Sequence, residues 1–121
     1  MRLSDLSDFD NIVIQCHDNP DPDAVASGFG LYRFFAADTR RHVRFFYAGK
    51  YVIQKPNILM MIERLGIPLE HVESLEEVPD LLIVVDGQYG EGNVTTLPGK
   101  SIAVIDHHPD SGRTFDFSEI R

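Results

Sequence analysis

Runs of apolar residues alternate with polar turns along this chain, and four of the runs are short and continuous. These four are rich in β-branched or aromatic side chains and comprise residues 12–16 (IVIQC), 43–48 (VRFFYA), 81–85 (LLIVV) and 101–105 (SIAVI). Each has the length and composition of a buried strand. Because strands covered on both faces are continuously apolar, the four runs predict a mainly parallel sheet.

A helix is predicted after the first run. Asp21 suits the N-cap position, and Pro22 suits the first helical position. The apolar residues that follow recur at helical spacing, which predicts that one side of the helix is buried. These residues are Ala24, Gly28, Leu31, Tyr32 and Phe35.

A second helix is predicted over residues 56–65, where Gly66 stops it and Pro68 lies just beyond. The predicted order is therefore strand, helix, strand, helix, strand, strand. Such alternation is typical of an α/β fold, and we expect helices on both faces of the sheet.

Ionisable residues directly follow three of the four predicted strands. His17 comes after the first, Asp86 after the third, and Asp106, His107 and His108 after the fourth. Ligands of open α/β sheets bind outside the carboxyl ends of the strands. We therefore expect these residues to converge on one crevice although they are far apart in the sequence.

The turn after the first strand carries much of the expected chemistry. Residues 17–23 read HDNPDPD, and their two prolines restrict the backbone. His17, Asp21 and Asp23 thus share one tight turn, where carboxylates two positions apart can face two different ions. Together with Asp86 the carboxylates would repel one another, and a divalent cation removes that penalty. Mixed imidazole and carboxylate donors suit Mn, Fe, Co or Zn.

Length, charge and cysteine content narrow the class of protein. The chain has 121 residues, which fits one small domain. A formal net charge of -8 argues against tight non-specific binding of long duplex nucleic acid. A single cysteine, Cys16, and the lack of a signal peptide favour the cytoplasm, and no apolar run has the length of a membrane span.

Three segments together resemble the motifs of the DHH phosphoesterase family, which includes RecJ-type exonucleases and nanoRNases. HDNPDPDAVAS at 17–27 resembles the first motif, LLIVVDGQ at 81–88 the second, and VIDHH at 104–108 the third. Their order and separations also match. The resemblance implies a Rossmann-like DHH domain and an Mn-dependent hydrolase that cleaves phosphodiester or phosphoanhydride bonds.

The resemblance also implies a ligand set for two metal ions. His17 and Asp21 would bind one ion, Asp23 and His107 would bind the other, and Asp86 would bridge both. The implied ions are Mn²⁺, two in the complete protein, with Mg²⁺ or Co²⁺ as alternatives.

Two further residues of the third motif are the catalytic candidates. By resemblance, His108 would lie near the substrate phosphate or behind the metal ligands, and Asp106 would orient an imidazole as outer carboxylates do. A water activated between the two ions would attack phosphorus, so no nucleophilic side chain is needed.

One departure from the family pattern concerns the end of the chain. The family's fourth motif, another metal-binding aspartate, and its DHH-associated domain are not found within 1–121. We therefore expect residues 1–121 to be the N-terminal part of a longer protein, and to have weak activity or none alone.

The expected substrate is a small nucleotide or a short oligonucleotide. We expect no membrane partner, and a homodimer is possible in principle. The alternative is a non-catalytic metal- or nucleotide-binding module of a larger regulatory protein.

A small basic cluster is formed by Arg40, Arg41, His42 and Arg44. We interpret it as a solvated face or as partners of nearby acids rather than as an RNA contact.

Overall fold

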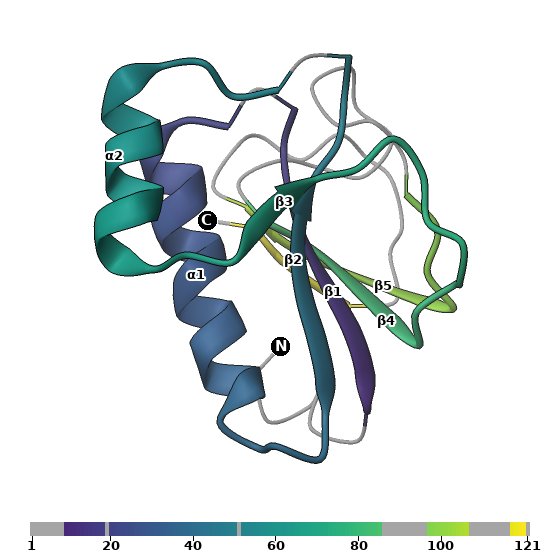
Figure 1. The fold of residues 1–121 in the computed structure, drawn as a ribbon. Coiled ribbons are helices and arrows are strands. Elements are labelled where there is room, and N and C mark those ends of the chain that lie inside the picture. The colour runs from purple at the N-terminus through teal and green to yellow at the C-terminus, as the bar shows by residue number, and fades with distance from the viewer. Residues whose placement is uncertain (1–8, 19, 51, 86–96, 107–116, 121) are drawn as a thin grey trace.

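The computed structural model describes residues 9–18, 20–50, 52–85, 97–106 and 117–120 (Figure 1). Six strands form one sheet, and every pair of neighbouring strands is parallel. Two helices follow the first two strands. The elements are β1 (Asn11–Cys16), α1 (Pro22–Ala36), β2 (His42–Tyr47), α2 (Pro56–Leu65), β3 (Leu69–His71), β4 (Leu81–Val85), β5 (Ser101–Asp106) and β6 (Phe117–Ile120).

The strand order β3-β2-β1-β4-β5-β6 makes this a Rossmann-like α/β fold, as predicted. The four predicted strands correspond to β1, β2, β4 and β5, and their ends differ from the predicted ends by no more than one residue. β3 and β6 were not predicted. β3 has only three residues (LEH) and β6 only four (FSEI), so neither shows the apolar run that identifies a buried strand.

β1 occupies the place where the chain reverses its direction of travel across the sheet. From β1 the chain moves outward to β2 and then β3, whereas β4, β5 and β6 extend on the other side. This topological switch point is where open α/β sheets bind their ligands, outside the carboxyl ends of the strands. The carboxyl end of β1 is the end that leads into His17.

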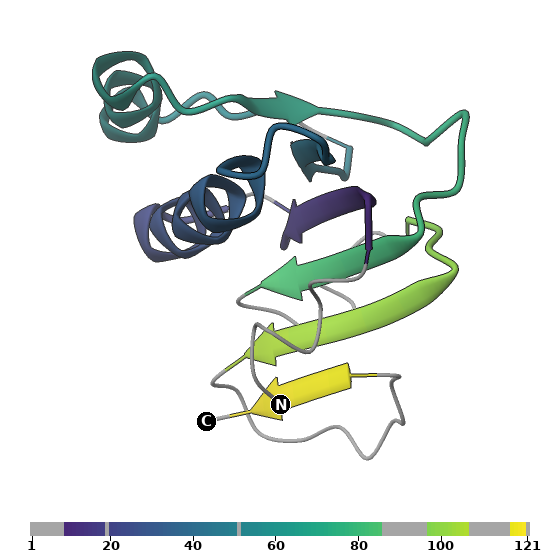
Figure 2. The ribbon, with the colours of Figure 1, turned by 90° about the horizontal axis from the view of Figure 1, so that it is seen from below.

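Within the described residues, both helices cover the same face of the sheet (Figure 2). Parallel strands are joined by right-handed crossovers. The steps from β1 to β2 and from β2 to β3 run in the same direction, so α1 and α2 come to lie on one face. The expectation of helices on both faces is therefore not met in the part of the chain that the structure describes.

The second face has a smaller buried cluster of its own. Its members are Val13, Phe46, Ala48, Leu82, Val84 and Leu97, with Val72, Leu75 and Ile102 packed against them. Val72 and Leu75 belong to the connection from β3 to β4, which crosses this face without forming a helix. Because β4 lies on the other side of β1, a right-handed crossover requires this connection to use the second face.

Helix α1 packs closely on the sheet at Gly28. A Cβ built there would lie 2.3 and 2.4 Å from two ring atoms of Phe45 and 3.4 Å from the Cys16 Sγ. Phe45 is almost fully buried, so its ring has little room to move. The predicted buried side of α1 is confirmed, since Ala24, Gly28 and Phe35 are buried.

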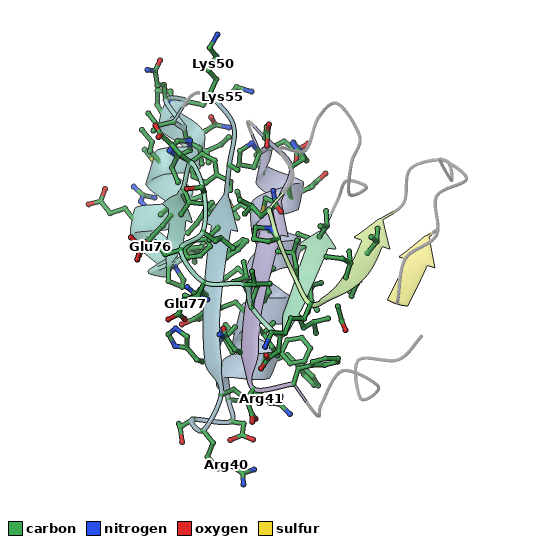
Figure 3. All side chains as sticks on the ribbon, turned by 90° about the vertical axis from the view of Figure 1, so that its right-hand side faces the viewer. Arg40, Arg41, Lys50, Lys55, Glu76 and Glu77 are labelled. Carbon is green, nitrogen blue, oxygen red and sulfur yellow. The ribbon has the colours of Figure 1, made fainter. Side chains whose placement is uncertain are left out.

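The basic cluster lies at the amino ends of the strands. Arg40 hydrogen-bonds the Asp38 carboxylate at 3.0 and 3.1 Å, and the Arg41 guanidinium lies 5.6 Å from the Phe35 ring centre. Arg44 donates a hydrogen bond to Asn11 at 3.2 Å. Figure 3 shows Arg40 and Arg41 at the end of the sheet away from Lys50. These contacts with neighbouring side chains support the interpretation of the cluster as a local structural feature.

Among the described residues, no helix combines the length and the apolar character needed to cross a membrane.

Gly28→Ala should lower the free energy of unfolding by about 1–3 kcal/mol, because the new methyl group overpacks the site against Phe45. Gly30→Ala is the matched control, since no atom lies within 4 Å of a Cβ at that exposed helical position. Gly30→Ala should raise the free energy of unfolding by up to about 1 kcal/mol, because alanine has the higher helix propensity. Denaturant unfolding measures both changes. Equal stability of the two variants would contradict the packing described for α1.

Hydrogen bonds from the Arg40 side chain and, second, from the Arg40 backbone N–H lower the pKa of the Asp38 carboxyl from 3.8 to about 2. Because the folded-state pKa is depressed, the pair stabilises the fold above the usual Asp pKa, and that contribution is lost as the pH falls through about 2. The pair is exposed, so the effect on stability is small. Arg40→Ala should raise the Asp38 pKa part of the way back toward 3.8 in an NMR titration, because the backbone N–H of residue 40 keeps its hydrogen bond to the carboxylate. Arg64→Ala should leave it unchanged, and a shift there would contradict the local cause.

Candidate metal centre

The carboxyl ends of the central strands are aligned by the sheet register. Cys16, the last residue of β1, pairs with Tyr47 of β2 and with Val85 of β4. Val85 in turn pairs with Ile105 of β5. The strands that carry the predicted ligands therefore end side by side at the switch point, as the sequence predicted.

His17 and Asp21 face each other just beyond β1. The His17 Nε2 lies 3.8 Å from the Asp21 Oδ2, and the exposed fractions of the two side chains are 14% and 53%. The other ring nitrogen, Nδ1, donates a hydrogen bond of 2.7 Å to the backbone oxygen of Asp18. Since a carbonyl only accepts, the proton must lie on Nδ1, and in the neutral ring the Nε2 lone pair is directed to the side of Asp21.

Asp21 has a structural role in addition to facing His17. It is the N-cap of α1, and its Oδ1 accepts a hydrogen bond of 2.8 Å from the backbone nitrogen of Ala24. Pro22 follows at the first helical position, as predicted. The cap occupies Oδ1 and holds the carboxylate so that Oδ2 is the oxygen nearest His17.

The turn between His17 and α1 is fixed by its prolines. Pro20 is buried, and Pro22 starts the helix with a backbone angle that suits it. Asp23 lies in the first turn of α1 and is exposed, and its side chain makes no hydrogen bond or ion pair within the described residues. A negative charge in this position is favourable because the N-terminal end of a helix carries partial positive charge.

The remaining predicted site residues belong to the ends of β4 and β5. Asp106 is the last residue of β5, and its backbone pairs with Ile120 of β6. Asp86, His107 and His108 lie outside the described residues. In the ranges that the structure does describe, no three His, Cys, Asp or Glu side chains gather closely enough to hold a metal ion. Of the three predicted ligands that the structure describes, it brings two together, His17 and Asp21.

Sequence reasoning missed a set of residues beside His17. His71, at the end of β3, donates a hydrogen bond of 2.8 Å from Nε2 to the backbone oxygen of Gly49. Gly49 has a φ of +100° and packs against the side chain of Asp18. Gly49 could have been noticed in the sequence, because a glycine directly after an apolar run often marks a turn with a special backbone conformation. No local pattern identifies His71, because its contact depends on the pairing of β3 with β2.

Positive side chains lie at the same end of the sheet. Figure 3 shows Lys50 and Lys55 beyond the carboxyl end of β2, and both are exposed. In a chain with a net charge of -8, these two cations place positive charge at the same end of the sheet as His17 and Asp21.

A parallel α/β sheet with an imidazole and a carboxylate at its switch point defines this chain as a Rossmann-like domain with a candidate metal-binding rim. The family model described as "DHH family, N-terminal domain" matches residues 11–120. The chain therefore belongs to the DHH family, whose members are in general metal-dependent phosphoesterases. A search of curated proteins found none that matches the chain.

The two roles of Asp21 can be separated by substitution. Asp21→Ala removes the cap, and we expect it to lower the free energy of unfolding by about 0.5–2 kcal/mol. Asp21→Asn keeps an oxygen for the Ala24 nitrogen, so stability in the absence of metal should stay close to that of the unmodified protein. Thermal melts in the presence of a chelator measure both. Equal losses in the two variants would mean that the carboxylate charge, rather than the cap, stabilises the turn.

Proposed function

We propose that this chain forms the metal-binding part of a phosphoesterase. Its substrate would be a phosphodiester or phosphoanhydride bond in a small nucleotide or short oligonucleotide. The observation that carries the proposal is the His17–Asp21 pair at the switch point of a DHH-family domain. The pair occupies the positions that the first family motif assigns to metal ligands.

The donor chemistry of this pair fits a divalent cation. The hydrogen bond from Nδ1 to the Asp18 oxygen holds the ring in place, as an outer hydrogen bond does for a ligating histidine, and Nε2 is the ring nitrogen near Asp21. The capping bond of Oδ1 holds the Asp21 carboxylate in place and leaves Oδ2 at 3.8 Å from Nε2. A divalent cation bound by both groups would be attracted to the carboxylate and would accept the lone pair of the imidazole nitrogen.

The other proposed ligands follow the resemblance. Asp23 and His107 would bind the second ion, and Asp86 would bridge the two. The aligned ends of β1, β4 and β5 support this assignment, since Val85 pairs with both Cys16 and Ile105. His107 comes two positions after Ile105, and Asp86 comes directly after Val85.

The proposed ions are Mn²⁺, with Mg²⁺ or Co²⁺ as alternatives, because the donors combine imidazole and carboxylate. When bound, two such ions would supply an activated water and neutralise the charge that develops on the phosphate. His108 would contact the substrate phosphate, and Asp106 would orient an imidazole of the site. Lys50 and Lys55 would favour the approach of an anionic substrate to this rim.

Asp86→Asn provides the sharpest test, because Asp86 is the residue proposed to contact both ions. In a protein that also carries the family's fourth motif and DHH-associated domain, the substitution should impair binding of both Mn²⁺ ions and lower the turnover of bis-p-nitrophenyl phosphate at least about a hundredfold, the loss for one strong electrostatic contact in the transition state. Asp21→Asn should mainly weaken the binding of one of the two ions. The metal-free fold should survive Asp86→Asn, because removing one carboxylate lowers like-charge repulsion.

The measurements are Mn²⁺ titration calorimetry, turnover and a thermal melt on the same samples. Retention of both ions with near-normal turnover would remove Asp86 from the site. Normal Mn²⁺ binding without hydrolysis of any phosphodiester, in a protein that also carries the family's fourth motif and DHH-associated domain, would favour a non-catalytic regulatory module.

A further inference from the structure

The imidazole of His71 is held firmly at the end of β3. Backbone pairing places His71 opposite Tyr47, and the Val72 backbone nitrogen donates a 3.0 Å hydrogen bond to the backbone oxygen of Tyr47. The two rings are in tilted contact, with centroids 5.1 Å apart. From this fixed position the His71 Nε2 donates its 2.8 Å hydrogen bond to the Gly49 oxygen. His71 thus fixes the first turn of chain after β2.

The Gly49 backbone, which His71 holds in place, lies against the side chain of Asp18. A Cβ at Gly49 would lie 2.8 Å from the Asp18 Cγ and 2.9 Å from its Oδ2, which is closer than real Cβ atoms approach. The φ of +100° is also one that residues with side chains rarely adopt. The Gly49 backbone and the Asp18 side chain are therefore in direct contact, and the position of one limits the position of the other.

Asp18 connects the contact to the candidate metal ligand. Its backbone oxygen accepts the 2.7 Å hydrogen bond from the His17 Nδ1, which sets the tautomer and the direction of the ring. The Nε2 then lies 3.8 Å from the Asp21 Oδ2. A series of contacts thus runs from β3, an edge strand of the sheet, through the Gly49 backbone to the Asp18 side chain, and the Asp18 backbone oxygen completes it at His17.

We propose that His71 is a positioning residue for His17 and acts through Gly49 and Asp18. The inference rests on the proposed function of His17 as a metal ligand. The sheet does not need the His71 side chain for its pairing, since β2 and β3 are joined by backbone hydrogen bonds. The far part of the segment after β2 has its own attachment, a 2.9 Å hydrogen bond from the Ile53 nitrogen to the Tyr47 hydroxyl. The His71 bond therefore restrains mainly the part of the segment that contacts Asp18.

His71→Ala should weaken Mn²⁺ binding about tenfold, at the low end of the effect of removing an outer partner of a metal ligand. His71→Gln should restore most of the affinity, because its amide can donate to the Gly49 oxygen from a similar position. His42→Ala is the control, since His42 is an exposed histidine at the amino end of β2. It should leave Mn²⁺ affinity unchanged.

Gly49→Ala tests the middle of the series, and Gly66→Ala is its matched control. Both positions have positive φ, but a Cβ at Gly66 meets no atom within 4 Å, whereas one at Gly49 meets Asp18. Both variants should lose stability through backbone strain. Gly49→Ala alone should weaken Mn²⁺ binding, because it alone displaces Asp18.

Imidazole ¹⁵N spectra of the metal-free proteins give a readout that does not depend on metal. The His17 signal should show a proton on Nδ1 in the unmodified protein, and a mixture of tautomers in His71→Ala and Gly49→Ala. His71→Gln, His42→Ala and Gly66→Ala should keep the Nδ1 signal.

Failure of this inference can be distinguished from failure of the proposed function. If the unmodified protein binds no Mn²⁺, the proposed function is wrong, and the ¹⁵N spectra still decide whether His71 orients His17. If the unmodified protein binds Mn²⁺ and His71→Ala changes neither the affinity nor the His17 spectrum, the positioning role is wrong. Equal losses of affinity in His71→Ala and His71→Gln, in step with their melting temperatures, would also overturn it.

Discussion

The position of β1 between β2 and β4 is the constraint on which the rest of this structure depends. Because the chain leaves β1 toward one side of the sheet and returns to the other, the carboxyl end of β1 lies at the topological switch point. Its backbone groups pair with parallel strands on both sides, and its side chains are buried on both faces. The turn that follows therefore starts from a rigid base, and a short, proline-restricted segment is enough to bring His17 and Asp21 together.

The sequence predicted the interior of the fold well because burial on both faces produces an unmistakable pattern. LLIVV is fully buried along β4, and the predicted ends of α2 agree with the structure because Pro56 and Gly66 fix them by backbone geometry. The short outer strands could not be predicted in the same way. LEH and FSEI form strands through pairing with β2 and β5, and that pairing depends on the complete sheet.

The same distinction applies to the candidate site. His17 and Asp21 lie four positions apart on one turn, so their meeting follows from local sequence. The contact between His71 and Gly49 joins residues 22 positions apart and depends on the register of two strands. Asp23, also predicted as a ligand, is exposed, and its role stays a prediction. So do the roles of Asp86, Asp106, His107 and His108.

The double contact of Asp21 would couple the proposed ion binding to the conformation of the chain. One oxygen of its carboxylate accepts a hydrogen bond from the Ala24 backbone nitrogen in the first turn of α1, and the other faces His17. A cation that holds the second oxygen would also make release of the first one more costly, because a ligand that binds only the ordered form stabilises that form. Opening of the first helical turn and loss of the ion would then be a single coupled event, and the exchange of the Ala24 amide proton would report on occupancy of a site that it does not touch.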